Sequence, residues 1–176
     1  MPSEKNRGYR FQWKDLGDIE EGRPNLGASM NVSVYRLLQY TLREVITAEL
    51  GSDKARQLFV DAGKLAGSEF CRNLLNTDLR FSEFLSHVQS KLKDLNIGIL
   101  RVEKADEEKL ELVLTVMEDL DCSGLPVLGE TVCDYDEGLL AGILGTYTGR
   151  EFVVKEVDCW ASGSRVCRFE ARPKER

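Results

Sequence analysis

The sequence has few of the features that would mark a catalytic, nucleic-acid-binding or membrane protein. It holds one histidine in 176 residues, which leaves little scope for Ser-His or Cys-His catalysis. Its net charge of −6 argues against nucleic acid, which needs a basic surface. No apolar run approaches the about 18–20 residues that span a bilayer. We therefore expect one soluble globular domain, with no nucleic-acid partner and no membrane span.

Two further absences bear on chemistry and on the cellular compartment. No Gly-rich dinucleotide fingerprint follows a predicted strand, so a reductase bound to NAD or FAD has little support. The chain opens Met-Pro-Ser-Glu-Lys-Asn-Arg, without the apolar core of a signal peptide. We therefore expect a cytoplasmic protein, whose cysteines are kept reduced and are not joined in disulfides.

What the sequence does contain is a group of thiols and one carboxylate towards its C-terminus. Glu156, Cys159, Gly163 and Cys167 form a Glu-x2-Cys-x3-Gly-x3-Cys pattern, and Cys133 precedes them. Thiolates and a carboxylate suit a borderline-soft cation such as zinc, and four such ligands complete a tetrahedral shell. A shell filled by protein ligands indicates a structural metal.

The spacing around this pattern predicts a hairpin. Residues 150–157 and 165–171 have the composition of antiparallel strands, and residues 160–164 that of a turn in which Gly163 can take a positive φ. Side chains alternate along a strand, so Glu156 and Cys159 would face opposite sides. We therefore expect the first strand to end or bulge near Asp158 if both residues are to reach one ion.

Cys133 stands before an acidic stretch that predicts the first turn of a helix over 137–145. A helix N-terminus favours negative charge and would stabilise a thiolate there. A simpler reading stays open, because free cysteine is often just a small buried apolar residue. That reading fits Cys71, which falls in an apolar helical pattern. Cys122 lies in a loop and could be a decoy ligand near Cys133.

The rest of the chain predicts an α+β fold, with N-terminal helices packed on an antiparallel four-stranded sheet. Apolar periodicity indicates helices over 31–50, 52–75 and 80–95, followed by strands over 97–102 and 109–117. The second helix carries small residues that would let another helix, a partner subunit or a ligand approach closely. They are Ala62, Gly63, Ala66 and Gly67.

The cysteine motif, with weaker similarity in the N-terminal helices, resembles the 4-vinyl reductase domain family, whose members are small zinc-containing hydrocarbon-binding and sensor domains. The resemblance implies that Cys133, Glu156, Cys159 and Cys167 bind a structural zinc ion. It also implies a fold shared with haem-based nitric-oxide sensors and with subunits that tether vesicles in Golgi transport. A homodimer is a further implication of the resemblance.

These observations divide the chain into two parts. Residues 1–29 predict an N-terminal arm or edge strand, whose aromatic residues Tyr9, Phe11 and Trp13 could pack on a partner or on their own core. Residues 30–176 predict a single domain of the 4-vinyl reductase type, ending in a zinc-bound hairpin.

Three functions follow as hypotheses. The first is a sensor or carrier that binds a small hydrophobic or aromatic molecule in an apolar pocket, beside the small residues Gly138, Ala141 and Gly142. Those glycines could equally serve close packing alone. The alternatives are a reductase acting on a vinyl group of a tetrapyrrole precursor, and a dimeric scaffold. His87 is expected to be a solvated surface residue, with haem ligation as the less supported alternative.

Overall fold

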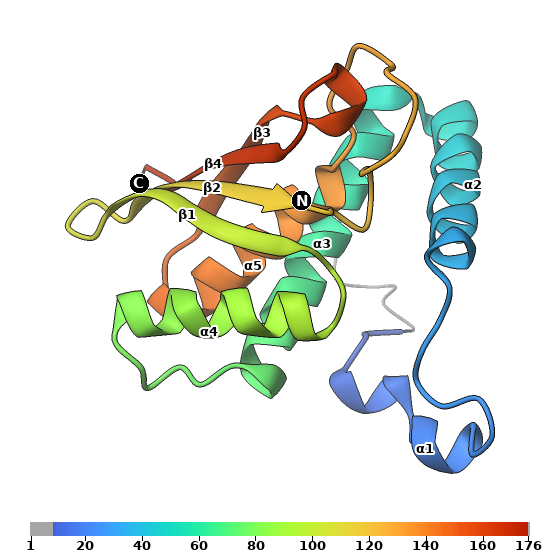
Figure 1. Ribbon diagram of the computed structural model, residues 1–176, viewed down its shortest axis with the longest axis horizontal. Helices are drawn as coiled ribbons and strands as arrows, with labels where there is room; N and C mark the ends of the chain where they lie inside the picture. Colours follow the sequence, from blue (N-terminus) through green and yellow to red (C-terminus); the bar gives the residue numbers. More distant parts are fainter. Residues whose placement is uncertain (1–8, 176) are drawn as a thin grey trace.

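The computed structural model describes residues 9–175 and has the predicted α+β architecture. Five α-helices and four strands follow one another, with two short 3-10 helices, in the order shown in Figure 1. Their bounds are η2 Trp13–Leu16, α1 Ile19–Gly22, α2 Val32–Leu50, α3 Ser52–Leu74, α4 Phe81–Asp94, β1 Ile99–Asp106, β2 Glu111–Met117, α5 Asp134–Thr148, β3 Phe152–Asp158, η3 Trp160–Ser162 and β4 Cys167–Pro173.

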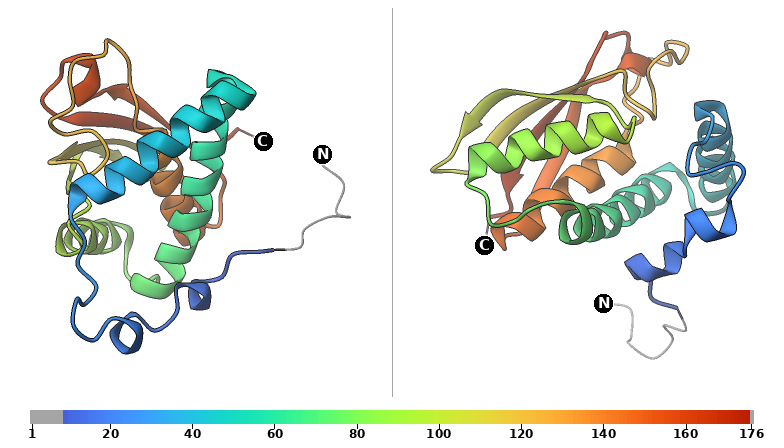
Figure 2. Two further views of the ribbon diagram at one scale, coloured as in Figure 1. Left: turned by 90° about the vertical axis from the view of Figure 1, so that its right-hand side faces the viewer. Right: turned by 60° about the horizontal axis from the view of Figure 1, so that its bottom comes forward.

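The four strands form one antiparallel sheet in the order β1-β2-β4-β3. Helices α4 and α5 cover one face, and α3 packs on the far side of α5 (Figure 2). The core lies between the sheet and the first helical layer. Its largest fully buried side chains include Phe84, Phe152, Phe169, Leu114 and Ile143.

Helix α5 is the centre of the molecule. The ten residues from 136 to 145 are almost all apolar or small, and burial extends around the whole helix from Asp134 to Leu144. A helix that is apolar on every side suits a position between two layers, here the sheet and α3. The sequence predicted this helix over 137–145. It is longer because the acidic residues before it form its first turn, where negative charge is favourable.

The small residues of α3 serve the contact with α5. A Cβ atom added to Gly63 would lie 2.1 Å from the carbonyl oxygen of Tyr135, and one added to Gly67 would lie 2.1 Å from that of Leu139. The glycines of α5 meet α3 just as closely. Of the three occupants that the sequence allowed for this surface, the structure therefore has a helix.

Helix α2 stands apart from this stack and has an unusual polarity. Figure 1 shows it at the edge of the molecule, and its few contacts with other helices are with α3. The face of α2 that contacts the protein carries polar side chains, whereas its apolar side chains point to solvent. The exposed ones are Val34, Leu37, Leu38, Leu42 and Val45.

Residues 9–29 form an arm and contain no strand. The arm consists of η2, α1 and connecting turns, and it runs past the lower part of α3 before it reaches α2 (Figure 2). Across residues 9–175, no helix is both long and apolar enough to cross a bilayer.

Candidate functional site

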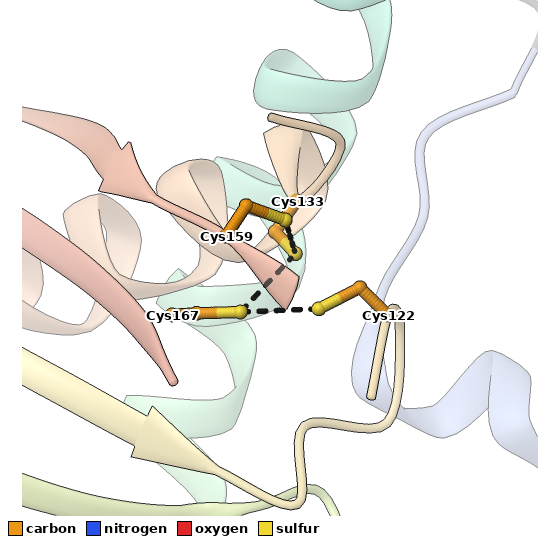
Figure 3. A group of neighbouring side chains, drawn as sticks. All are labelled: Cys122, Cys133, Cys159 and Cys167. Atoms are coloured by element: carbon orange, nitrogen blue, oxygen red, sulfur yellow. Dashed lines mark hydrogen bonds between the residues drawn. The ribbon is translucent and has the colours of Figure 1, made fainter. Parts of the chain in front are cut away.

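Four cysteine side chains converge at one end of the sheet. They come from separate segments: Cys122 follows β2, Cys133 caps α5, Cys159 follows β3, and Cys167 begins β4 (Figure 3). Their sulfur atoms all lie within 4.8 Å of one another, and all four residues are buried. None of the five cysteines, all of which the structure describes, is joined in a disulfide.

The local structure that brings these cysteines together matches the prediction made from the spacing. β3 ends at Asp158, and its register with β4 shifts between Glu156 and Asp158. This irregularity turns Cys159 towards Cys167. The connection continues as η3, and Gly163 has a φ of 104°. Such an angle is readily available only to glycine, which explains the residue at this place in the motif.

The sulfur positions suit a tetrahedral metal. The Sγ atom of Cys133 lies 3.8 Å from that of Cys159 and 3.8 Å from that of Cys167. Four thiolates at the usual zinc–sulfur distance of about 2.3 Å would have sulfurs about 3.8 Å apart. The sulfur atoms of Cys122 and Cys167 are closer, at 3.1 Å. This donor set is soft, dry and closed, as in a structural zinc site.

The four thiols also share their protons unequally. Hydrogen bonding, first from Cys122 and then from the other two cysteines, lowers the pKa of Cys159 well below that of a free thiol. Hydrogen bonding from Cys122 raises the pKa of Cys133 and of Cys167. One thiolate is therefore favoured even without a cation, which prepares the cluster for a divalent ion.

The structure brings three of the four predicted ligands together and adds a cysteine in the fourth place. Glu156 lies beside the cluster: its Oε2 atom accepts a hydrogen bond of 3.0 Å from the Cys133 amide, and its buried Oε1 atom has no partner. Burial raises the pKa of Glu156 to about 8. Cys122 takes the position that the sequence spacing gave to Glu156. The signal for it was its closeness to Cys133 along the chain.

Two acidic loops surround the cysteines, and α2 holds both. Arg36 donates to the carbonyl oxygens of Leu120, Asp119 and Ser123 at 2.7, 3.2 and 2.9 Å. Arg43 donates to the Asp134 carboxylate at 2.6 Å and to the Val132 carbonyl at 2.9 Å.

These bonds explain the polar inner face of α2, because they tie it to the segments that carry Cys122 and Cys133. Sequence periodicity could not show this, because the bonding partners lie some 80–90 residues away along the chain.

An apolar cavity of about 300 Å³ lies next to this network. It is not between the sheet and its helices, where large side chains fill the space, but between the arm, α2, α3 and α5. Aromatic and apolar side chains provide most of its wall: Phe11, Trp13, Leu16, Tyr35, Phe70 and Tyr135. Its volume is at the lower end of the range for small-molecule sites.

Buried carboxylates stand at the wall of this cavity nearest the cysteines. Asp121 accepts hydrogen bonds from the Tyr35 hydroxyl at 2.8 Å and from the Gln39 amide at 2.6 Å. Asp136 is buried, and its Oδ2 atom has no hydrogen-bond partner. Loss of solvent, followed by repulsion from Asp121 and Asp119, raises the pKa of Asp136 well above the usual carboxyl value.

The remaining residues singled out from the sequence have structural positions. Cys71 is fully buried in the core of the protein. His87 is only partly exposed, and its Nδ1 atom accepts a hydrogen bond of 3.2 Å from the Asn76 amide. Gly138 and Gly142 lie in the contact with α3.

Comparison with known proteins agrees with the motif. The sequence model of one family, the 4-vinyl reductase domain, matches residues 112–173, which include all four clustered cysteines. An uncharacterized protein of Methanocaldococcus jannaschii, MJ1642, is 28% identical over 148 residues, which are 84% of this chain and 80% of that protein.

Solved structures share the fold at low sequence identity. The phenol-responsive sensory domain of the transcription activator PoxR, solved with phenol, has a TM-score of 0.63 and 16% identity over 82% of this chain and 75% of its own. A vinyl-4-reductase family protein from M. jannaschii has a TM-score of 0.62 and 20% identity over 96% and 100% of the two chains.

Two further structures confirm the predicted relation to vesicle-tethering subunits and nitric-oxide sensors. Subunit 3 of a trafficking protein particle complex from Naegleria fowleri has a TM-score of 0.61, with 11% identity over 81% of this chain and 97% of its own. An H-NOX protein from S. oneidensis has a TM-score of 0.51, with 10% identity over 78% and 74%. The family identified from the cysteine motif is also confirmed: the C-terminal part of this protein is a 4-vinyl reductase domain.

Proposed function

We propose that this protein is a small-molecule sensor or carrier domain, in which a structural zinc ion fixes the wall of an apolar ligand cavity. The observation that carries the proposal is the contiguity of two features: the closed four-cysteine cluster, and the aromatic cavity that reaches Asp121 and Asp136 beside it. A phenol-binding sensory domain with the same fold supports a small aromatic ligand.

We propose that Cys122, Cys133, Cys159 and Cys167 hold the zinc ion, with Glu156 next to them. Supporting this set, the four sulfurs are mutually within 4.8 Å, whereas Glu156 already accepts a hydrogen bond from the Cys133 amide. The set inferred from resemblance, with Glu156 in place of Cys122, is the alternative, and the unpartnered Oε1 atom of Glu156 is its main support. Either set fills a tetrahedral shell.

The metal would connect segments that no other strong contact joins. Cys122 and Cys133 lie on the long connection between β2 and α5, while Cys159 and Cys167 flank the hairpin turn. When bound, zinc would supply a cross-link, and the free energy of binding it would stabilise the fold. Four thiolate ligands leave no coordination position for a substrate, which favours binding over catalysis. A reductase acting on a vinyl group remains the alternative function.

A homodimer formed through α2 would explain the reversed polarity of that helix. Leu37 and Leu38 are 66% and 68% exposed, and the apolar residues recur every three or four positions along one face. A second copy of α2 would cover this stripe with an equally apolar one. The same helix contacts the cavity through Tyr35, so pairing would couple ligand binding to the partner subunit.

We also infer a reducing compartment, such as the cytoplasm, as the place of action. The support is that a zinc site of this kind needs its cysteines as thiolates, which an oxidising compartment would convert to disulfides.

The direct test is elemental analysis combined with ligand screening. Purified protein should contain about one zinc per chain. Its thermal midpoint should rise in the presence of small aromatic compounds, because a ligand that binds only the folded state stabilises it. Protein that contains zinc but is not stabilised by any aromatic compound would refute the binding function.

A further inference from the structure

The cavity under the arm has an uneven inventory of charge. Its wall contains three carboxylates, Glu69, Asp121 and Asp136, whereas no lysine, arginine or histidine is among the described residues that line it. The nearby arginines are engaged elsewhere, because Arg36 binds loop carbonyls and Arg43 binds Asp134 and a carbonyl.

Two of the three carboxylates already have partners. Both oxygens of Asp121 accept hydrogen bonds from α2, and the oxygens of Glu69 lie near Arg72 and Asn73. Asp136 differs, because its Oδ2 atom is buried and accepts nothing from the described protein. A buried acceptor without a donor costs about 1–3 kcal/mol, so such a group in a cavity wall marks where a ligand donor would be favoured.

The aromatic wall adds a second preference. Phe11, Trp13, Tyr35 and Tyr135 surround the same space, and aromatic ring faces attract cations. A zinc ion held by four thiolates beside the cavity would itself carry net negative charge, which would favour a cation further.

We propose that the ligand of this cavity is an organic cation, an aromatic or alkyl amine whose ammonium group donates a hydrogen bond to Asp136 while its apolar part lies among the aromatic rings. This inference rests on the proposed ligand-binding function and narrows it. It distinguishes this protein from a receptor for neutral hydrocarbons, which would leave Asp136 without a donor. It also predicts that carboxylate ligands are rejected.

The test uses four compounds of nearly the same shape: 2-phenylethylamine, 2-phenylethanol, ethylbenzene and phenylacetate. Isothermal titration calorimetry on the full zinc-loaded chain at neutral pH should rank the amine first and phenylacetate last. We expect the amine to bind at least about tenfold more tightly than the alcohol.

Two variants locate the effect. Asp136→Asn should lower the amine affinity at least about tenfold and leave ethylbenzene affinity nearly unchanged. Trp13→Leu, on the arm and away from the core, should lower the amine affinity several-fold through loss of a ring face and serves if Asp136→Asn does not fold.

The outcomes separate the two proposals. If the alcohol or ethylbenzene binds as tightly as the amine, the cation inference is overturned and the binding function stands. If none of the four compounds binds, the binding function fails and the inference fails with it.

Discussion

Gly63 on α3 and Gly138 on α5 face each other with no side chain between them: a Cβ atom on Gly138 would lie 2.9 Å from the Cα atom of Gly63 and 2.1 Å from the carbonyl oxygen of Val60. The equivalent contact one turn further on joins Gly67 and Gly142. The two helices therefore touch backbone to backbone beside the cavity and the cysteines.

This contact predicts that Gly138→Ala is destabilising. Alanine normally favours a helix over glycine by about 1 kcal/mol, but here its methyl group would overlap backbone atoms that cannot move independently. We expect a net loss of at least about 1–3 kcal/mol in the free energy of unfolding, measured by urea denaturation. Gly22→Ala is the matched control, because nothing lies within 4 Å of that position. Equal stability of the two variants would contradict the contact.

The identity of the fourth zinc ligand can be decided by two substitutions. If Cys122 binds the metal, Cys122→Ser should reduce zinc content and lower stability by several kcal/mol, because part of the metal-binding energy is folding energy. Glu156→Gln should then retain zinc, with affinity reduced about 10–100-fold by loss of support for Cys133. Zinc content by mass spectrometry and thermal unfolding are the measurements.

Cys71→Ser provides the control for that experiment, since Cys71 is buried but lies outside the cluster. It should lose some stability and no zinc. The opposite pattern, with zinc lost in Glu156→Gln and kept in Cys122→Ser, would assign the fourth position to the carboxylate.

Removal of the metal should loosen one end of the domain. A strong chelator is expected to lower the thermal midpoint and to increase amide exchange in the β2–α5 connection and around residues 159–167, while α4 stays protected. Acid should act in the same direction, because protons compete with zinc for thiolates, so zinc affinity should fall as the pH is lowered. Unchanged exchange in the apo protein would argue against a cross-linking role.

The dimer proposal predicts the effect of charge on the outer face of α2. The double substitution Leu38→Glu and Val45→Glu should raise the dimer dissociation constant at least about a hundredfold, because two apolar contacts would be replaced by buried charge. Analytical ultracentrifugation gives the constant. Leu26→Glu is the control, because Leu26 is as exposed but lies on the arm. A wild-type protein that is monomeric at high concentration would refute the proposal.

Sequence periodicity predicted most of the fold because the relevant signals are local. The helices at α2, α3 and α4 and the bulge near Asp158 follow from spacing and from the demand that Glu156 and Cys159 reach one place. The positive φ of Gly163 follows from its place in a turn.

Long-range geometry was beyond the reach of the pattern. Cys122 sits in a loop with no periodicity, and only the three-dimensional fold shows that its sulfur meets that of Cys167, 45 residues later. The reversed polarity of α2 was also hidden, because an amphipathic pattern does not say which face meets the protein. The cavity under the arm depends on segments more than 100 residues apart.

The glycine contact between α3 and α5 has a mechanical consequence. Helices that share a backbone seam cannot slide or separate without breaking many contacts together, so this pair should behave as a rigid beam. Any motion that reports an occupied cavity must then occur in what borders the beam, namely α2 and the N-terminal arm. A signal would thus leave the protein from its edge, while its centre stays still.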